Sequence, residues 1–540
     1  MKESLLLMDT DGIKNYVFGT NKLRDIRGAS AILDELNRIE MTEIVKRITN
    51  NNFVTIFSNG GVGEFVVPTD CVNQIIESVK NAYNENGASV TCTSLHLDGD
   101  FNIQESDVDF QIKQLAYDLQ SKKSGFRTKI AISNPFFRTC DICHEKVASV
   151  KDVIPTEFYI CHRCQSKRDK LAKLKAKTKK YFRTTNPLSD KSMRSRLIEE
   201  LKKLEKDNKL EFILDENLAF PDEIEDVNES ENDYIGLIYA DGNNMRREIE
   251  KRKKLPEHRD FSESIDDAIF SSLASAINKF LHPYQNTRHK KTQIMFPFDV
   301  LLLGGDDLII VCQAKKALNV AIEICNTFYK ETKEKFSLSI GVALAHTNFP
   351  IRLLLKIAEN LLKVAKTERV NFMRYENDAS RKNAFTKNRI EEFRRGAINF
   401  MTISNSASLL YEDYYNDSLE SEYEKEKFVK TFRPYSPKQL ERLLELGEEL
   451  IDSKFPKSKL EYLGEALFSG KFNSMLKSLV VFTRAKTEQK ALLRQLFNFY
   501  PELEMLPPWQ TLGYDMKTKK TAILDILEIY RFLGESKNED

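Results

Sequence analysis

The sequence predicts an α+β protein with two ferredoxin-like units, a zinc-binding insertion and a C-terminal α-helical domain. Two segments share a pattern: an apolar run ends at an Asp-Gly turn, and a hairpin with a double glycine follows later. Two Cys-x-x-Cys pairs lie between these segments, and long amphipathic patterns follow the second one. The 540 residues are enough for four domains with their own cores. We expect these domains at residues 1–130, 131–230, 231–387 and 388–540.

The first unit begins with an apolar strand pattern within the first ten residues, which runs into an Asp-Thr-Asp-Gly turn. A predicted hairpin follows, with Gly60 and Gly61 at its turn. Val62 and Gly63 occupy the next two positions, and Glu64 is displaced from them. We therefore expect no metal pair here. The double glycine is expected to accept a nucleotide, since backbone without a Cβ allows close approach.

Cysteine spacing predicts the zinc-binding insertion. Two Cys-x-x-Cys pairs are separated by the 17 residues from 144 to 160, a spacing typical of a four-thiolate zinc site with a structural role. The expected ligands are Cys140, Cys143, Cys161 and Cys164. His144 and His162 flank the pairs, and either could replace one thiolate.

The second unit carries the residues that indicate chemistry. The apolar run 234–240 predicts a strand that ends at Asp241, and Asp306 and Asp307 follow Gly304 and Gly305 at a predicted hairpin tip. Adjacent carboxylates repel each other, so a divalent cation between them is the simplest explanation. One strand-end acid and two hairpin acids are what palm-type nucleotidyltransferases use to hold two Mg²⁺ ions. An ordinary solvated hairpin is the alternative.

The elements around this hairpin predict the fold of the second unit. A helix at 317–328, a strand at 336–344 and a helix at 351–367 complete the order βαββαβ, which is a ferredoxin-like palm. Lys363 and Lys366 share one face of the last helix. They form either a solvated face or a contact with an incoming triphosphate, for which Lys366 is the better placed.

These motifs make the chain similar to a known family. Residues 239–245, 303–307, 339–343 and 358–366 resemble the large polymerase-like subunit of type III CRISPR effector complexes, a palm-domain relative of GGDEF-type diguanylate cyclases. Members carry two palm domains, a zinc-binding insertion and a helical C-terminal domain, so the resemblance covers most of the chain. Many also carry a nuclease domain marked by a His-Asp dyad. No such dyad occurs here, and we expect no DNase activity.

The resemblance implies a nucleotide site. Asp241, Asp306 and Asp307 would be catalytic, and with the carbonyl of Gly242 they would hold Mg²⁺ or Mn²⁺. The residues implied in nucleotide binding are Gly242, Asn243, Asn244, Gly304, Gly305, Lys363, Lys366, Gly60 and Gly61.

Charge is balanced overall, at +1, but not locally. Nine of the seventeen residues in 167–183 are basic, whereas 211–233 contains ten acids and no base. The basic run predicts a helix with either a solvated face or a surface for RNA or a partner. The acidic run is expected to be a solvated linker.

The C-terminal region predicts long amphipathic helices without residues that indicate chemistry. The expected helices are 389–400, 438–455, 457–468, 486–498 and 521–533. Trp509 lies where prolines interrupt them and is expected to anchor them together. The sequence contains no signal peptide and no twenty-residue apolar run, and it has eight cysteines, which together indicate a reducing cytoplasm.

Two classes of function fit these observations. The first is a metal-dependent enzyme that makes cyclic oligonucleotide messengers from ATP in antiviral defence. The second is an RNA- or protein-binding scaffold subunit of a CRISPR effector with a vestigial site. A diguanylate-type cyclase that uses GTP is a further possibility, and the sequence sets neither the activating signal nor the oligomeric state.

Overall fold

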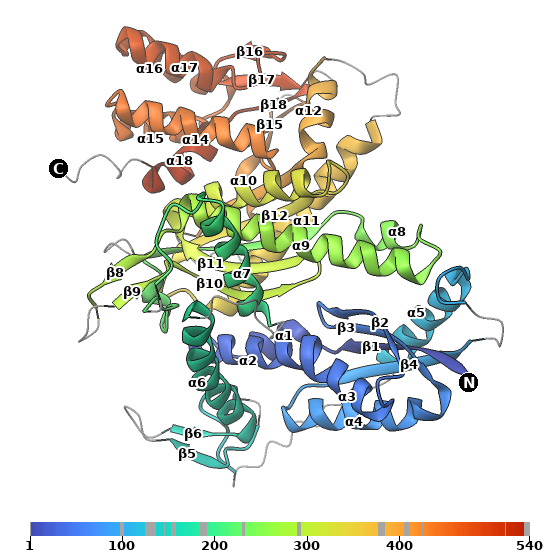
Figure 1. Cartoon of the computed structure of the whole chain (residues 1–540). Helices are drawn as coiled ribbons and strands as arrows, with labels where there is room; N and C mark the ends of the chain where they lie inside the picture. Colours follow the sequence, from blue (N-terminus) through green and yellow to red (C-terminus); the bar gives the residue numbers. More distant parts are fainter. Residues whose placement is uncertain are drawn as a thin grey trace.

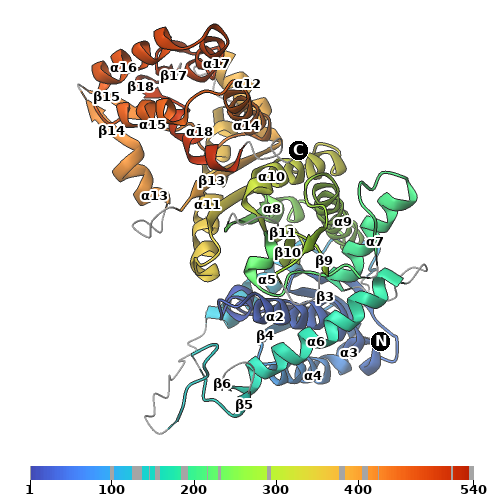
Figure 2. The same ribbon diagram turned by 90° about the vertical axis from the view of Figure 1, so that its left-hand side faces the viewer.

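The computed structural model describes residues 2–97, 102–124, 137–144, 146–152, 158–183, 192–215, 217–228, 233–288, 293–375, 384–403, 411–423, 425–512 and 515–533. The strands of this part of the chain form three larger sheets and two short hairpins. Figure 1 shows the sheets in succession, from the blue N-terminal part through the yellow-green middle part to the orange and red C-terminal part. One hydrophobic core joins the first two parts, and another joins the middle and C-terminal parts. Figure 2 shows the same succession from the side.

The N-terminal sheet is antiparallel, with the order β2-β3-β1-β4. One face, which includes Met8 and Phe65, packs against α2, α3 and α4. The other face, which includes Leu5 and Val66, packs against α5. Both faces are covered because successive side chains of a strand point to opposite sides. The elements are β1 (Glu3–Thr10), α1 (Ile13–Val17), α2 (Leu23–Glu35), η1 (Leu36–Glu40), α3 (Met41–Ile48), β2 (Val54–Asn59), β3 (Val62–Pro68), η2 (Thr69–Cys71), α4 (Val72–Glu85), β4 (Val90–His96) and α5 (Asp109–Ser124).

The middle sheet has the order β10-β11-β7-β12-β13. The helices α9 and α10 cover one face, where Ile238 and Ile310 lie, and α11 covers the other, where Leu237 and Ile309 lie. The predicted order βαββαβ is therefore present. The elements are β7 (Tyr234–Gly242), α8 (Met245–Ile249), α9 (Leu255–Phe280), the hairpin β8 (Tyr284–Asn286) and β9 (Gln293–Met295), β10 (Phe298–Gly304), β11 (Asp307–Gln313), α10 (Ala314–Glu331), β12 (Leu338–His346), α11 (Ile351–Tyr375), α12 (Ala384–Arg394) and β13 (Gly396–Thr402).

The end of the middle sheet corrects one prediction. From the sequence, the segment 389–400 is expected to form one helix. Instead, α12 ends at Arg394 and the strand β13 follows, which pairs in parallel with β12. The sheet thus extends past residue 387, the expected boundary of this domain. Gly396, the first residue of β13, has φ 148°, which a helix does not allow. A short apolar run such as 397–401 cannot be assigned to strand or helix from periodicity alone.

Two helices and a hairpin connect the first two sheets. They are β5 (Val150–Asp152), β6 (Phe158–Ile160), α6 (His162–Arg183) and α7 (Met193–Lys206), followed by the short η3 (Ile224–Val227). The basic run forms most of α6, as expected, but it is not only a solvated face. Its start lies against α2, since a Cβ on Gly28 would be 2.1 Å from the carbonyl oxygen of Lys167. The ammonium of Lys167 also donates to the carbonyl of Tyr16 at 2.7 Å.

The C-terminal part is only partly helical, so the expected α-helical domain needs correction. Five short strands form a sheet with the order β14-β15-β18-β17-β16, and strands this short carry little periodic signal. Trp509 lies in β17 and donates its indole N–H to Ser474 of α16 at 2.9 Å, which confirms its anchoring position. The elements are α13 (Tyr411–Tyr414), η5 (Tyr415–Leu419), β14 (Glu420–Tyr423), β15 (Glu426–Val429), α14 (Pro437–Asp452), α15 (Lys457–Ala466), α16 (Lys471–Arg484), α17 (Thr487–Phe497), β16 (Glu504–Leu506), β17 (Trp509–Leu512), β18 (Asp515–Lys520), α18 (Ile523–Ile529) and η6 (Tyr530–Phe532).

None of the helices in the described ranges is long and apolar enough to cross a membrane.

Candidate active site and zinc cluster

Three carboxylates gather at one edge of the middle sheet. Asp241 lies near the end of β7, Asp306 lies in the turn between β10 and β11, and Asp307 begins β11. Gly305 opens this turn at φ 63°, a left-handed conformation that glycine adopts without strain. A Cβ on Gly242 would lie 2.5 Å from a carboxylate oxygen of Asp306, so this side chain packs directly against the end of β7. The structure thus brings together the residues that the sequence predicted as metal ligands.

The electrostatics of this cluster favour a cation. Burial, and then the nearby charge of Asp241, raise the pKa of Asp306 to about 6 and that of Asp307 to about 8. Carboxylates that raise one another's pKa values can be neutralised either by protons or by a divalent cation. The donor set is three carboxylates and the Gly242 carbonyl, all hard oxygen ligands that suit Mg²⁺ or Mn²⁺.

The two lysines of α11 have different surroundings. The ammonium of Lys366 donates to the carboxylate of Asp241 and, at 3.0 Å, to the carbonyl of Gly242. Lys363, one turn earlier, is exposed. Of the two predicted triphosphate contacts, Lys366 is therefore the one that lies at the carboxylate cluster.

Asn243 and Asn244 shape the turn that follows Asp241. The side-chain amide of Asn243 donates to Ser337 at 3.1 Å and accepts from the hydroxyl of Ser339 at 2.8 Å. These bonds tie the end of β7 to β12. Asn244 begins α8 at φ 61°, in the left-handed region that asparagine tolerates better than most residues. Both residues, predicted to bind a nucleotide, have a clear structural part in holding the turn.

The two double-glycine hairpins meet tip to tip. A Cβ on Gly304 would lie 2.5 Å from the Cα of Gly60, and a Cβ on Gly60 would lie 3.1 Å from the carbonyl carbon of Gly304. A cavity of about 470 Å³ opens beside this contact and is lined by both hairpins, α1, α2 and α11, within the size range of ligand pockets. The lining includes Lys14, Ser30, Asn37, Gly60, Gly61, Gly304, Asp307, Arg352, Lys356 and Glu359.

Sequence reasoning missed the polar contacts that cross this cavity. The ammonium of Lys14 lies 3.0 Å from Glu359 and 4.7 Å from the centre of the Tyr239 ring. Lys14 and Glu359 are 345 residues apart, so no local pattern could have paired them. The proximity of Lys14 to the Asp-Gly turn of the first unit was the only available signal.

The residues of the first hairpin that correspond to Asp306 and Asp307 lie one position earlier than predicted. Asn59 pairs with Val62 as Gly304 pairs with Asp307. Consequently Gly61 and Val62, not Val62 and Gly63, occupy the positions of Asp306 and Asp307. Register explains the shift, since a count from the first glycine ignores where the strands pair. Unlike the second hairpin, the first therefore has no carboxylate at these two positions.

Glu64 lies away from the hairpin tip. Its side chain is buried in β3, opposite Leu7 of β1. Burial raises the pKa of Glu64 to about 7. A residue in this position packs inside the sheet, away from the hairpin tip.

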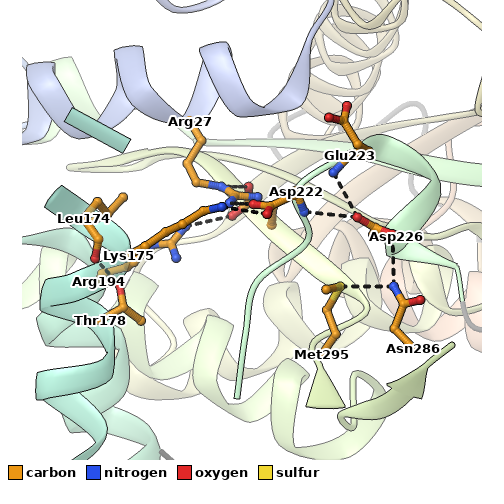
Figure 3. A network of polar contacts seen from close by, with 11 residues as sticks. Arg27, Leu174, Lys175, Thr178, Arg194, Asp222, Glu223, Asp226, Asn286 and Met295 are labelled. Atoms are coloured by element: carbon orange, nitrogen blue, oxygen red, sulfur yellow. Dashed lines mark hydrogen bonds and ion pairs between the residues drawn. The ribbon is translucent and has the colours of Figure 1, made fainter. Parts of the chain in front are cut away.

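A partly buried ionic network lies where the N-terminal and middle parts meet (Figure 3). Asp299 of β10 accepts from Arg27 of α2 at 2.6 Å and from Arg194 of α7 at 3.1 Å. Asp222 pairs with Arg27 at 3.4 Å and with Lys175 of α6 at 2.6 Å. These contacts connect four segments of the chain to β10, the strand that leads into the hairpin with Asp306 and Asp307.

The same network corrects the interpretation of the acidic run. Asp226 is buried, and its carboxylate accepts from the backbone of Glu223 at 3.1 Å and from Asn286 at 3.0 Å. Together with Asp222, this residue holds the segment before β7 in place. The acidic run is therefore not simply a solvated linker, because its partners come from distant parts of the chain.

The four predicted zinc ligands lie together. Their sulfur atoms are all within 4.8 Å of one another, and those of Cys143 and Cys161 are 3.9 Å apart. Thiolates around a tetrahedral zinc are about 3.8 Å apart, so the cluster fits a structural zinc site. Among the described residues, the cluster that could hold this metal consists of the four cysteines and includes neither His144 nor His162. The cluster lies at the start of α6, which packs on α2 beside the cavity.

Comparison with known proteins agrees with this fold. The family model for "Cas10/Cmr2, second palm domain" matches residues 234–373. No curated protein matches the chain. Among solved structures, the Csm1–Csm4 cassette in complex with cA4 is similar, with 13% identity over 98% of this chain and 70% of that chain and a TM-score of 0.56. The same cassette with one ATP has 13% identity, 98% and 70% coverage and a TM-score of 0.53.

Csm1 of T. onnurineus is 12% identical over 98% of this chain and 69% of that chain, with a TM-score of 0.53. Such identities show a shared fold. The resemblance drawn from the sequence motifs is confirmed: residues 234–373 match the Cas10/Cmr2 second palm domain, and the fold of the chain is similar to that of Csm1.

Proposed function

We propose that the protein is a Mg²⁺- or Mn²⁺-dependent nucleotidyltransferase that joins ATP through 3′–5′ bonds into cyclic oligoadenylate. The observation that carries the proposal is the meeting of Asp241, Asp306 and Asp307 beside a cavity lined by both double-glycine hairpins. The solved Csm1–Csm4 cassettes hold ATP, pppApA and cA4. These molecules would be the substrate, an intermediate and a product of such a reaction.

The residues at the edge of the middle sheet have distinct parts in this proposal. Asp241, Asp306, Asp307 and the Gly242 carbonyl would hold the cations. Bound there, two divalent ions would lower the pKa of the attacking 3′-hydroxyl and neutralise the leaving pyrophosphate. Lys366 would bind phosphate oxygens. The backbone at Gly304 would approach the nucleotide closely because no Cβ intervenes.

We assign the N-terminal sheet to a first, non-catalytic palm domain. Its strand order β2-β3-β1-β4 matches β10-β11-β7-β12, and both hairpins have a register shift at the same place, after Thr55 and after Val300. The Gly60-Gly61 turn would accept the second of two nucleotides across the cavity. Since it offers Gly61 and Val62 in place of the hairpin acids, the chemistry would take place at the middle sheet.

We also propose that the chain works with partners in CRISPR-type antiviral defence. Csm1 forms a cassette with Csm4 in the solved structures, and a comparable subunit, together with RNA, is the partner that we propose here. The scaffold alternative predicts the same partners without chemistry at Asp306 and Asp307.

One experiment separates these possibilities. The protein is incubated with each nucleoside triphosphate and with Mg²⁺ or Mn²⁺, with and without RNA, and the products are identified by mass spectrometry. Cyclic oligoadenylate from ATP is expected. Loss of one electrostatic stabiliser of this kind costs roughly 10²–10³-fold in rate, so the double variant Asp306→Asn, Asp307→Asn should fall to background while retaining zinc. Products from GTP would favour the diguanylate-type cyclase. A wild type inert under every condition, or a double variant as active as wild type, would reject the proposal.

A further inference from the structure

Lys366 contacts the two groups at the end of β7 that the proposed metal site would use. Its ammonium donates to the carboxylate of Asp241 and to the carbonyl oxygen of Gly242. An ammonium and a metal cation cannot share both oxygens, because each needs the same lone pairs and the two positive charges repel. Lys366 and a divalent cation are therefore competitors at this position.

The setting of Lys366 supports this competition. It reaches the cluster from α11, and its side chain is 32% exposed, next to Asp241 at 28%. A lysine has a long, flexible stem and a compact charge, so it can leave toward solvent or toward a bound phosphate without any change in the sheet. Lys14, the other cation that lies near Asp307, is held by Glu359 at 3.0 Å.

The first sheet contains an equivalent pair, which is an independent observation. Lys123 of α5 lies 2.6 Å from Asp9 and 3.6 Å from Asp11. Asp9 pairs with Val62 between β1 and β3. In the middle sheet Ala240 pairs with Leu308, and the next position along the same register brings Asp241 opposite Asp307. Asp9 is therefore the counterpart of Asp241. The helix α5 follows β4 as α11 follows β12.

The two pairs differ in the hairpin that faces them. In the first sheet the hairpin contributes Gly61 and Val62 at the positions of the two acids. A divalent cation would find fewer carboxylates there, and Lys123 is the lasting counterion. In the middle sheet the hairpin adds the carboxylates of Asp306 and Asp307 beside the pair of Asp241 and Lys366. These two additional carboxylates would allow a divalent cation to displace the ammonium.

We propose that Lys366 is a tethered cation that occupies the metal position of the metal-free protein and is displaced when a divalent cation binds, whereas Lys123 remains in place. The inference rests on the metal site of the proposed function and adds a role for Lys366 before nucleotide arrives. Displacement frees the ammonium for the phosphates of a nucleotide. The metal-free protein, in turn, keeps its carboxylate cluster partly neutralised.

The first test measures Mn²⁺ affinity by electron paramagnetic resonance, without nucleotide. Lys366→Met removes the competitor and keeps the length of the side chain. We expect Mn²⁺ to bind about fivefold more tightly, since a partly exposed ion pair is worth up to about 1 kcal/mol, which corresponds to that factor. Lys363→Met removes the same charge one turn away and should leave the affinity within about twofold. Lys366→Gln serves as a second variant if the methionine variant does not fold.

The second test uses the wild type, so folding is not at issue. A lysine that is held by carboxylates acylates slowly, and a released one acylates faster. Limited labelling with an amine-reactive ester, followed by peptide mass spectrometry, should show Lys366 labelled several-fold faster when Mg²⁺ is added. Lys123 in the same molecule should label at an unchanged rate.

The outcomes separate this inference from the metal site itself. Mn²⁺ binding that requires Asp306 and Asp307, with unchanged or weaker affinity in Lys366→Met, overturns the competition and leaves the metal site standing. If neither wild type nor Lys366→Met binds Mn²⁺ at these acids, both ideas fall. Faster labelling of Lys366 and Lys123 alike would also contradict the inference, because it would reflect a general effect of the salt.

Discussion

Replacement of Glu64 by Gln tests whether the buried carboxyl of this residue lowers the stability of the first sheet at neutral pH. It also tests whether Glu64 takes part in product formation. Glu64 is 4% exposed, and burial raises the pKa of its carboxyl from the ordinary 4.5 to about 7. The folded protein therefore keeps a proton between these two pH values that the unfolded chain releases. Stability must fall as the pH rises through this window, because the folded state binds more protons than the unfolded state.

The magnitude follows from the size of the shift. One pKa unit corresponds to about 1.4 kcal/mol, so a rise from 4.5 to about 7 corresponds to about 3 kcal/mol of stability lost above pH 7. Below pH 4.5 the group is protonated in both states and contributes no such penalty. Gln is neutral and nearly the same size. Relative to wild type, Glu64→Gln should thus gain up to about 3 kcal/mol between pH 4.5 and pH 8.

The assay must report on the first sheet alone, because a chain with several domains does not have a single unfolding free energy. The only tryptophan, Trp509, lies in the C-terminal sheet and cannot serve. Hydrogen exchange of peptides from β1 and β3, compared between wild type and variant at each pH, gives the local opening free energy. Glu77→Gln, at an exposed position on α4, is the control and should show no pH-dependent difference.

A constant difference between Glu64→Gln and wild type from pH 5 to pH 8 would refute this reasoning, since it would mean that the carboxyl is charged throughout. The variant should also make nucleotide products at the wild-type rate. A loss of products in a folded variant would place Glu64 in the active site, contrary to its position inside the sheet.

Three further predictions concern the contacts around the site. Cys143→Ser should lower zinc content and folded yield, because a structural zinc supplies folding energy; elemental analysis checks this, and a wild type without zinc would contradict it. Gly304→Ala should weaken ATP binding, because the new Cβ would lie 2.5 Å from the Cα of Gly60 and must push the two hairpin tips apart. Calorimetry measures the affinity for ATP, and an unchanged affinity would show that the contact between the tips is dispensable. Asp299→Asn should lower the stability of the interface between the two parts by about 3–5 kcal/mol, because it leaves buried arginines without their carboxylate; equal exchange protection of α2 in both proteins would exclude this.

The sequence alone determined the features whose parts lie close together along the chain. The two Cys-x-x-Cys pairs, the acid at the end of β7 and the two acids of the β10–β11 turn were all recognisable, because a strand end or a tight turn is set by a few neighbouring residues. The order of elements in the middle sheet also followed from local periodicity. These residues were enough to identify a candidate metal site before its geometry was known.

Only the tertiary structure decided the features that depend on distant residues. It placed β13 beside β12, formed a sheet in the C-terminal part, shifted the equivalence at Gly61 by one residue and buried Asp226 in a network. It also joined Lys14 to Glu359 across the cavity. Strand register and cross-domain contacts are chosen by the packing of the whole chain, since many pairings satisfy the same local pattern and only one buries both cores.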